Sequence, residues 1–314
     1  MATLKLGILG FGEAGQSVAT GFKKSATAEH PIEIATWDIL LPSNEKGAPL
    51  KAAADRIGIR TVGSAAELAA SSDIVISLVT TDQSLVAAGQ IAKHLPKGIL
   101  FLDCNSTSPG MKRDVAKTVE AAGGRSVEAA VMDLVPRWQH KVPMLVAGPA
   151  ADELIGKLAP FGVVMEAVGD DIGAASTIKM CRSVFMKGLD AILMECMVAA
   201  ETAGVTDRIV ASLKVTMPEM DWKTFIGKKL GGAAQHSGRR AGEMREVATT
   251  LRELGLDPTM AEATATRLQW CADLGMKERA AATRVPSSIP EFVDDVRAGL
   301  AAQTVAQTAA KAAE

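Results

Sequence analysis

Tyrosine is absent from this chain of 314 residues, and aromatic residues of every kind make up only 4% of it. Dehydrogenases of the Tyr-x-x-x-Lys type depend on a tyrosine for acid–base chemistry, so they are excluded. Only four cysteines occur, far apart, without a C-x-x-C pair or a Cys/His cluster. They are typical of reduced thiols in a cytoplasmic protein and argue against a metal site.

The sequence also lacks a large excess of charge of either sign and lacks long hydrophobic runs. The 34 basic residues nearly balance the 36 acidic ones, so the composition favours neither nucleic acid nor an anionic membrane as a partner. No uncharged apolar run approaches the ~20 residues of a membrane span, and no signal peptide precedes the first predicted strand. We therefore expect a cytoplasmic protein with a small-molecule substrate, long enough for two domains with separate cores.

A glycine-rich turn near the N-terminus is the first motif that carries chemistry. The predicted strand Leu4–Leu9 leads directly into G-F-G-E-A-G and an amphipathic helix that ends near Lys24. Between a strand and a helix, such a turn is typical of a site for the pyrophosphate of a dinucleotide. A glycine-rich turn without a ligand is the weaker alternative. The predicted cofactor-binding residues of this turn are Gly10, Phe11, Gly12, Glu13, Ala14 and Gly15.

An acidic residue ends the second predicted strand, Ile32–Trp37. Asp38 stands where a carboxylate accepts hydrogen bonds from the adenosine ribose and repels a 2′-phosphate. No arginine follows it directly, and Lys46 is the nearest base. We therefore expect NAD rather than NADP, and we add Val79 and Thr80, at the end of a later strand, to the cofactor-binding residues.

Strand and helix signals alternate up to residue 168, and strand signals then stop. This order predicts a Rossmann-like, doubly wound parallel sheet over residues 1–168, followed by an all-α domain over residues 169–314. The remaining predicted strands are Ile59–Val62, Asp73–Val79, Ile99–Asp103, Val127–Val131, Met144–Val146 and Val163–Val168.

One long helix is predicted from Gly169 to Gly204, entered through Asp170 and Asp171 as its N-terminal caps. The helix is apolar almost all round, so we expect other elements to cover it on every side. A narrow polar stripe crosses this apolar body and contains Lys179, Ser183 and Asp190. The residues alone leave two readings of Lys179, a structural ion pair or a functional group that lines a cleft.

Two segments resemble the β-hydroxyacid dehydrogenases, the family of 6-phosphogluconate and 3-hydroxyisobutyrate dehydrogenases and imine reductases. D-C-N-S-T-S-P, residues 103–109, is similar to the family's D-x-S-T-x-x-P loop, with Asn105 in place of Ser and Ser106 in place of Thr. G-A-A-S-T-I-K, residues 173–179, is similar to the G-x-x-x-x-x-K segment. The resemblance implies that Lys179 is the catalytic acid and base, and that Asn105 and Ser106 contact the substrate or cofactor.

Departures from the family pattern concern the substrate. Ser183 stands where the family has an asparagine that orients the substrate. Where the family has D-A-P-V-S-G-G, whose last three residues hold a carboxylate, this chain has E-A-A-V-M-D-L, residues 128–134. Met132 and Asp133 disfavour a small anionic substrate, and Trp138 follows closely. Asp133 as the cap of a turn and Trp138 as a core residue are equally weighted alternatives.

The second half resembles a subgroup with an uncharacterised phosphogluconate-dehydrogenase-like C-terminal domain, through residues 182–189 and 236–246. In the family a basic residue from this second region enters the cleft. His236, which can exchange a proton near neutral pH, Arg239 and Arg240 are the candidates, and spacing does not choose among them. The alternative is a solvated helix in which Arg239 pairs with Glu243.

Three functions remain open at this point. The first is an NAD-dependent dehydrogenase of a bulky, aromatic or uncharged hydroxyl compound, in which Lys179 takes the hydroxyl proton. Ser183 and His236 complete the catalytic residues; Asn105, Ser106, Met132, Asp133 and Arg240 bind the substrate. The second is an NAD-binding lyase that releases formaldehyde or carbon dioxide, and the third is a nucleotide sensor without turnover. A homodimer through the helical domain is expected.

Overall fold

The structure, a computed structural model, describes residues 3–313. The chain divides into two compact units, Met1–Met180 and Cys181–Glu314. The division falls within helix α8 (Ala174–Thr202), whereas the sequence places the boundary between 168 and 169, before that helix begins. Each unit is described by itself.

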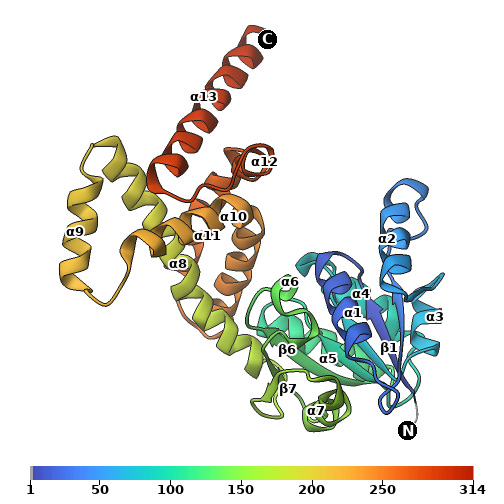
Figure 1. Cartoon of the computed structure of the whole chain (residues 1–314). Coiled ribbons are helices and arrows are strands. Elements are labelled where there is room, and N and C mark those ends of the chain that lie inside the picture. Colours follow the sequence, from blue (N-terminus) through green and yellow to red (C-terminus); the bar gives the residue numbers. More distant parts are fainter. Residues whose placement is uncertain (1–2, 314) are drawn as a thin grey trace. The chain divides into compact units, whose positions relative to one another are not determined.

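The first unit is built on one eight-stranded sheet with the order β3-β2-β1-β4-β5-β6-β7-β8 (Figure 1). All eight strands lie where the sequence predicts strands. Their bounds are β1 Leu4–Leu9, β2 Ile32–Trp37, β3 Arg60–Thr61, β4 Ile74–Ser77, β5 Leu100–Asp103, β6 Arg125–Val131, β7 Met144–Ala147 and β8 Met165–Ala167.

The sheet is parallel except at one pair, because β7 runs antiparallel to β6. The predicted doubly wound parallel sheet is confirmed, and this pair is its one exception among the described strands. The connection from β6 to β7 contains only the short helix α6 (Val135–Trp138) and a 3₁₀ turn, η2 (Gln139–Lys141). A parallel pair needs a crossover, usually over an α-helix, that returns the chain to the starting edge of the sheet, and the single turn of α6 does not span that length.

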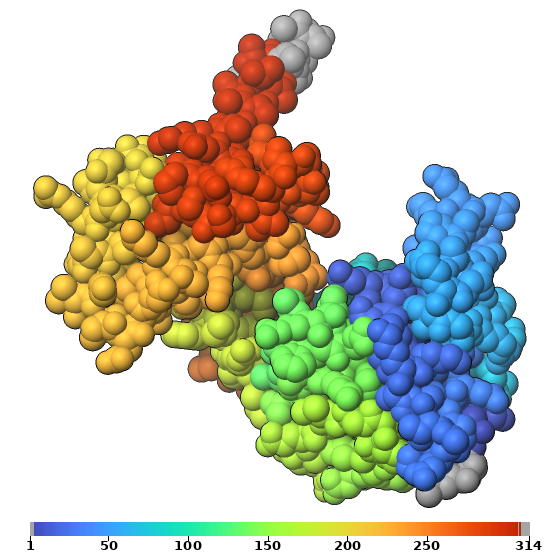
Figure 2. Space-filling model, viewed as in Figure 1, coloured from blue at the N-terminus to red at the C-terminus, as the bar shows by residue number. Residues whose placement is uncertain are grey.

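Helices lie on both faces of this sheet, as Figure 1 shows, and each face has its own apolar core. Helix α2 stands out from the rest of the unit (Figure 2). The other helices of this unit are α1 (Glu13–Ser25), α3 (Ala65–Ala70), α4 (Ser84–Ala92), α5 (Pro109–Ala121) and α7 (Ala151–Leu158), with α2 at Asn44–Ile57 and 3₁₀ turns η1 at Thr81–Gln83 and η3 at Ala159–Phe161.

The second unit contains helices and no strand among its described residues, as expected. After α8 come α9 (Thr206–Thr216), α10 (Trp222–Glu253), α11 (Thr259–Asp273), α12 (Met276–Ala282) and α13 (Ile289–Ala313). The last part of α13 extends away from the other helices of the unit (Figures 1 and 2). Among the described residues, no helix is both long and apolar enough to traverse a bilayer.

Helix α8 differs from its prediction in two ways. It begins at Ala174 rather than at 169, after the irregular segment that contains Asp170 and Asp171. It is also not covered on every side within one chain, since the side chains of Phe185 and Ile192 are 68% and 55% exposed. These two residues are seven apart, so they lie on the same face of the helix.

Candidate functional site

The three glycines of the first turn have three different surroundings. Gly10 has φ +91°, and a Cβ atom there would lie 2.6 Å from the carbonyl oxygen of Leu78. A Cβ atom on Gly15 would lie 2.3 Å from the carbonyl oxygen of Gly10, so this glycine lets α1 pack closely on the turn. A Cβ atom on Gly12 would meet nothing within 4 Å. Open space at the second glycine, at the N-terminus of α1, is what a pyrophosphate needs.

Asp38 holds this turn to the end of β2. Its Oδ2 accepts a hydrogen bond of 2.7 Å from the backbone N–H of Phe11, and its Oδ1 accepts one of 2.9 Å from that of Leu40. The ring of Phe11 is fully buried in the core, so Phe11 can bind a cofactor only through its backbone. Glu13 and Gly12 are exposed and Ala14 is half-buried. The residues present therefore fit a dinucleotide beside a carboxylate.

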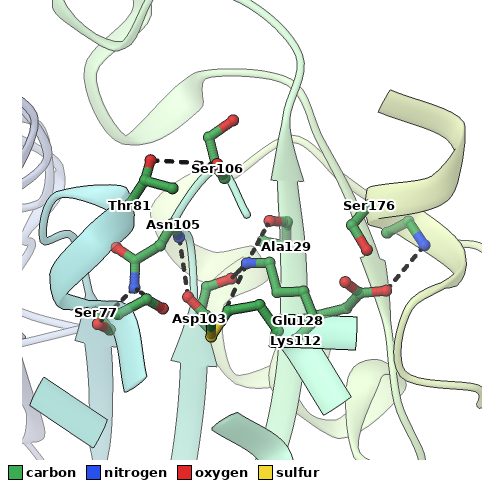
Figure 3. A network of polar contacts seen from close by, with 12 residues as sticks. Ser77, Thr81, Asp103, Asn105, Ser106, Lys112, Glu128, Ala129 and Ser176 are labelled. Atoms are coloured by element: carbon green, nitrogen blue, oxygen red, sulfur yellow. Dashed lines mark hydrogen bonds and ion pairs between the residues drawn. The ribbon is translucent and has the colours of Figure 1, made fainter. Parts of the chain in front are cut away.

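Asn105 joins the ends of β4 and β5 (Figure 3). Its amide oxygen accepts from the backbone N–H of Val79 at 2.8 Å, and its amide nitrogen donates to the hydroxyls of Ser77 and Ser84 at 3.0 and 3.1 Å. Both amide hydrogens are therefore used within the protein, and the residue is buried. These bonds fix the Val79–Thr80 loop, and the predicted contact of Asn105 with substrate or cofactor stays a prediction.

Ser106 differs from its neighbour Asn105. Its backbone carbonyl accepts a hydrogen bond from the hydroxyl of Thr81 at 3.3 Å, while its side chain points away from the buried network (Figure 3). Ser106 is half-buried, and Thr80 is exposed at the same edge. The predicted contact of Ser106 with substrate or cofactor is compatible with this orientation and stays a prediction.

A buried ion pair lies beneath this loop. Lys112 of α5 and Asp103 at the end of β5 are 3.2 Å apart, with side chains only 1% and 2% exposed. The ammonium group also donates to the carbonyl oxygens of Asp103 and Ala129, at 2.8 and 3.4 Å (Figure 3). Lys112 thereby ties the ends of β5 and β6 together. A buried lysine is tolerated because its charge is paired and its hydrogen bonds are made.

The pKa of the Cys104 thiol, just after β5, depends on burial and on nearby charges. Burial raises the pKa of Cys104 to about 12, and the charge of Asp103 acts in the same direction. The positive charges of Lys112 and Lys179 oppose this and lower the pKa. Of these causes burial is the largest, so the thiol stays protonated at neutral pH.

Glu128, in the middle of β6, caps the start of α8. Its Oε1 accepts hydrogen bonds from the backbone N–H groups of Gly173 and Ala175, at 2.6 and 3.0 Å. The prediction that Asp170 or Asp171 caps the helix is wrong, because the helix begins later and both residues are exposed. The cap comes from a neighbouring strand, 45 residues away in sequence.

The loop after β6 has a structure of its own. The Asp133 carboxylate accepts hydrogen bonds from the backbone N–H of Leu134 at 2.7 Å and from the indole N–H of Trp138 at 2.9 Å. Asp133 thus caps a turn, one of the alternatives given above, while Trp138 is 41% exposed and is not a core residue. The guanidinium of Arg137 lies 5.0 Å from the centre of the Trp138 ring. Met132, at the start of the loop, is half-buried.

In the second unit, Lys187 of α8 contacts both Ser183 of the same helix and Glu243 of α10. Ser183 is buried and accepts a hydrogen bond of 3.0 Å from the Lys187 ammonium, which also pairs with Glu243 at 3.1 Å. Glu243 makes the predicted i,i+4 ion pair with Arg239. This confirms that part of the sequence analysis, while the catalytic role of Ser183 stays a prediction.

Asp190 and Arg240 pair with each other. The Asp190 side chain is 4% exposed, and its two oxygens contact Arg240 at 2.7 Å and Lys229 at 2.8 Å. Arg240, predicted to bind substrate, is thus held by a carboxylate, which satisfies much of its charge. His236 is half-buried on α10, and its predicted exchange of protons stays a prediction.

Sequence reasoning missed the roles of Lys112, Glu128 and Lys229. For Lys112 and Glu128 the sequence holds a signal that could have been noticed, namely a charged residue within an apolar pattern. Lys112 lies on the same helix face as the buried Val115 and Val119, and Glu128 interrupts an apolar strand. Within residues 3–313, His, Cys, Asp and Glu side chains form no group of three suited to a metal ion.

Known proteins match both parts of the chain. Residues 5–153 match the NAD binding domain of 6-phosphogluconate dehydrogenase, and residues 200–271 match a domain of unknown function, DUF1932. An uncharacterized 28.5 kDa protein of Methanothermus fervidus is 31% identical over 83% of this chain and 96% of its own length. Mitochondrial 3-hydroxyisobutyrate dehydrogenase of Drosophila melanogaster is 24% identical over 82% of this chain and 78% of its own.

Solved structures also match most of the chain. A conserved hypothetical protein from Sinorhizobium meliloti has a TM-score of 0.74 and 34% identity over 93% of this chain and 95% of its own. A conserved protein of unknown function, described as similar to 3-hydroxyacid dehydrogenases, has a TM-score of 0.69 and 28% identity over 87% of this chain and 99% of its own.

A more distant structure contains a bound cofactor. The reductive aminase from Aspergillus terreus, solved with NADPH, has a TM-score of 0.54 and 20% identity over 93% of this chain and 99% of its own. This likeness extends to the fold alone. The matched domains and the relatives at 31% and 34% identity, together with the glycine turn, identify the family of this chain. The chain belongs to the β-hydroxyacid dehydrogenase superfamily, with a 6-phosphogluconate dehydrogenase-like NAD-binding domain and a helical C-terminal domain of the DUF1932 type.

Proposed function

We propose that this protein is an NAD-dependent dehydrogenase that oxidises a bulky, aromatic or uncharged hydroxyl compound, with Lys179 as the catalytic acid and base. The observation that carries the proposal is the glycine turn after β1, with open space at Gly12 and the Asp38 carboxylate bonded to the backbone of Phe11. The turn follows β1 in a largely parallel sheet, and carboxyl ends of parallel strands meet at one edge. We infer that Lys179, one helical turn beyond the Ala175 that packs with Ala130 of β6, lies near that edge.

Each group has a defined task in this reaction. When bound, NAD accepts the hydride. The amine of Lys179, in its neutral form, removes the proton of the substrate hydroxyl, and its ammonium form returns that proton in the reverse reaction. Asn105 keeps the Val79–Thr80 loop in place, and Ser106 directs its hydroxyl outward from the buried network.

NAD is the proposed cofactor rather than NADP. The carboxylate of Asp38 repels a 2′-phosphate. The two residues that follow it, Ile39 and Leu40, are 61% and 42% exposed and carry no positive charge that would bind such a phosphate. Titration of the two cofactors by fluorescence tests this proposal, which predicts clearly tighter binding of NAD. Equal affinity would contradict it.

The substrate class follows from the loop after β6. In place of the family's carboxylate-binding S-G-G, this loop presents the half-buried Met132, the Asp133 carboxylate and the exposed Trp138 ring. A carboxylate disfavours an anionic substrate by repulsion, and an indole ring offers a large apolar surface for a ring or an alkyl group.

The test is to follow absorbance at the NADH band while aromatic and uncharged alcohols are compared with small hydroxy acids. The proposal predicts stoichiometric NADH with the first group and little with the second. Lys179→Ala should lower turnover by about 10²–10⁴-fold while NAD binding stays unchanged. Product without net NADH would favour the lyase, and NAD binding without turnover on any alcohol would favour the sensor.

We also propose that the protein is a homodimer through α8. Phe185 and Ile192 expose large apolar side chains on one face of a helix whose other face is buried, and a second copy would cover them. Sedimentation of the wild type against the double variant Phe185→Glu/Ile192→Glu tests this; a wild-type monomer would contradict it.

A further inference from the structure

Glu128 is a charged group that the proposed chemistry does not use. It lies in the middle of β6, is 1% exposed, and has one carboxylate oxygen, Oε2, that is buried without a hydrogen-bond partner among the described residues. A buried carboxylate of this kind costs free energy unless its charge is compensated. The compensation is on Oε1, which accepts from two backbone N–H groups at the positive end of α8.

The start of α8 is held to the sheet at the same point by close packing. Ala175 is fully buried and packs with Ala130 of β6 and Ala147 of β7, where only small side chains allow the helix to come this close. Gly173, just before the helix, has φ +110°, a conformation that favours glycine. The hydroxyls of Ser176 and Thr177 both donate to its carbonyl oxygen, at 3.1 and 2.6 Å. The first turn therefore has one well-defined position on β6 and β7.

Lys179 follows Ala175 by four residues. In an α-helix this puts the two residues on nearly the same face, about 6 Å apart along the axis. Ala175 faces the sheet, so Lys179 leaves the helix on the sheet side, one turn further on. The effect of the Lys179 charge on Cys104 agrees with this direction.

We propose that Glu128 is a positioning residue: by capping α8 from the sheet, it fixes where the amine of Lys179 lies. Breaking the two hydrogen bonds to Gly173 and Ala175 frays the first turn, and the amine one turn later then samples several positions. The inference rests on the proposed role of Lys179 for its consequence in turnover. The link between Glu128 and the position of Lys179 is measurable without a substrate.

Two substitutions of similar size separate capping from simple removal of a charge. Glu128→Gln keeps an oxygen acceptor for the two N–H groups, and Glu128→Leu keeps the volume but offers none. Glu153→Gln is the matched control, since Glu153 is a half-exposed carboxylate of the same unit that pairs with Arg125 at 2.5 Å. Because Glu128→Leu can fail to fold, Glu128→Asp is the milder variant, which keeps the charge but draws the acceptor back from the two N–H groups by one methylene group.

The first measurement is NMR of the full-length protein with reductively ¹³C-methylated lysines. The Lys179 resonance is assigned by its loss in Lys179→Arg. We expect this resonance to shift and broaden in Glu128→Leu, to stay close to the wild-type position in Glu128→Gln, and to be unchanged in Glu153→Gln. A merely structural role of Glu128 would lower the unfolding midpoint and leave the resonance of the folded protein where it was. An unchanged resonance in folded Glu128→Leu or, if that variant does not fold, in Glu128→Asp overturns the proposal.

The second measurement separates this inference from the proposed function. With an alcohol that gives NADH, Glu128→Leu should lower kcat by about tenfold or more, since small displacements of a catalytic group cost at least that much. KM for NAD should stay within about twofold, because the glycine turn is not involved. If Lys179→Ala keeps full turnover, the proposed function is wrong. If Lys179→Ala is inactive and Glu128→Leu keeps the wild-type kcat, the inference is wrong.

Discussion

Two loops at the carboxyl edge of one sheet make an instructive contrast. The turn after β1 has three features of a dinucleotide site: Gly10 at positive φ, open space at Gly12 and close packing at Gly15. The loop after β6 replaces its family's S-G-G with Met132, Asp133 and Leu134 and adds an exposed Trp138. The first loop fits the NAD-binding domain that the chain matches. The second departs from the family pattern, so we expect it to contact the substrate.

The largest expected effect concerns the loop that follows the family pattern. Gly12→Val fills the open space at the second glycine, so we expect the Kd for NAD to rise on the order of a hundredfold or more while the fold is kept. Gly89→Val is the matched control, because a Cβ atom at Gly89, on α4, also meets nothing within 4 Å. Titration of both variants with NADH by fluorescence checks this. Unchanged affinity in Gly12→Val would mean that the cofactor does not bind at this turn.

Much of the first loop and its sheet can be predicted from sequence, because the residues that form them lie close together in the chain. The eight strands, the helix start at Glu13 and the Asp38 carboxylate each follow from residues that are neighbours in the chain. The cap of α8 and the partners of Asp190 join residues 45 and 50 positions apart. Periodicity identifies the face on which such a residue lies, but it does not identify the residue that faces it.

The reversed strand β7 escaped prediction for a related reason. An apolar strand looks the same in sequence whichever way it runs, and only its connection fixes the direction. The site residues divide in the same way. The glycine turn was predicted from its spacing, whereas the hydrogen bonds of Asn105 to Ser77, Ser84 and Val79 join residues more than 20 positions apart and could not be predicted.

The second prediction concerns the buried ion pair that ties β5 to β6, the strand before the second loop. Lys112→Met leaves the Asp103 carboxylate buried without its partner, which should lower the free energy of unfolding by about 3–5 kcal/mol. Arg125→Met is the control, because the Arg125–Glu153 pair is 42% exposed on both sides and should contribute about 0–1 kcal/mol. Urea unfolding at pH 7 measures both. Equal losses in the two variants would contradict the account of a buried pair that ties β5 to β6.

The third prediction concerns the loop that departs from the pattern. Trp138→Ala removes the exposed ring and one hydrogen bond of Asp133, so we expect KM for an aromatic alcohol to rise by up to about tenfold. The Kd for NAD should not change. Trp270→Ala is the matched control, since Trp270 also has an arginine, Arg267, 5.0 Å from the centre of its ring. A change in NAD affinity without a change in KM would show that Trp138 serves the cofactor instead.

The smallest effect concerns the far end of the same loop, at His140. Burial lowers the pKa of His140, its ring lies 4.9 Å from that of Phe22, and its Nε2 contacts the carbonyl oxygen of Phe161 at 2.8 Å. The folded protein therefore holds this histidine neutral below the pH at which the unfolded chain takes up a proton. Stability should fall as the pH drops below about 6.5. His140→Gln should lessen this slope between pH 6.5 and 5 in thermal unfolding, and an identical slope would contradict it.

A crystal structure of the protein with NAD tests the central claim most directly, through the position of the Lys179 amine relative to the nicotinamide ring. The account predicts that the pyrophosphate lies over Gly12, and that the amine and the ring face one space that holds a single hydroxyl-bearing carbon between them. An amine turned into protein packing, away from the nicotinamide, would contradict the account.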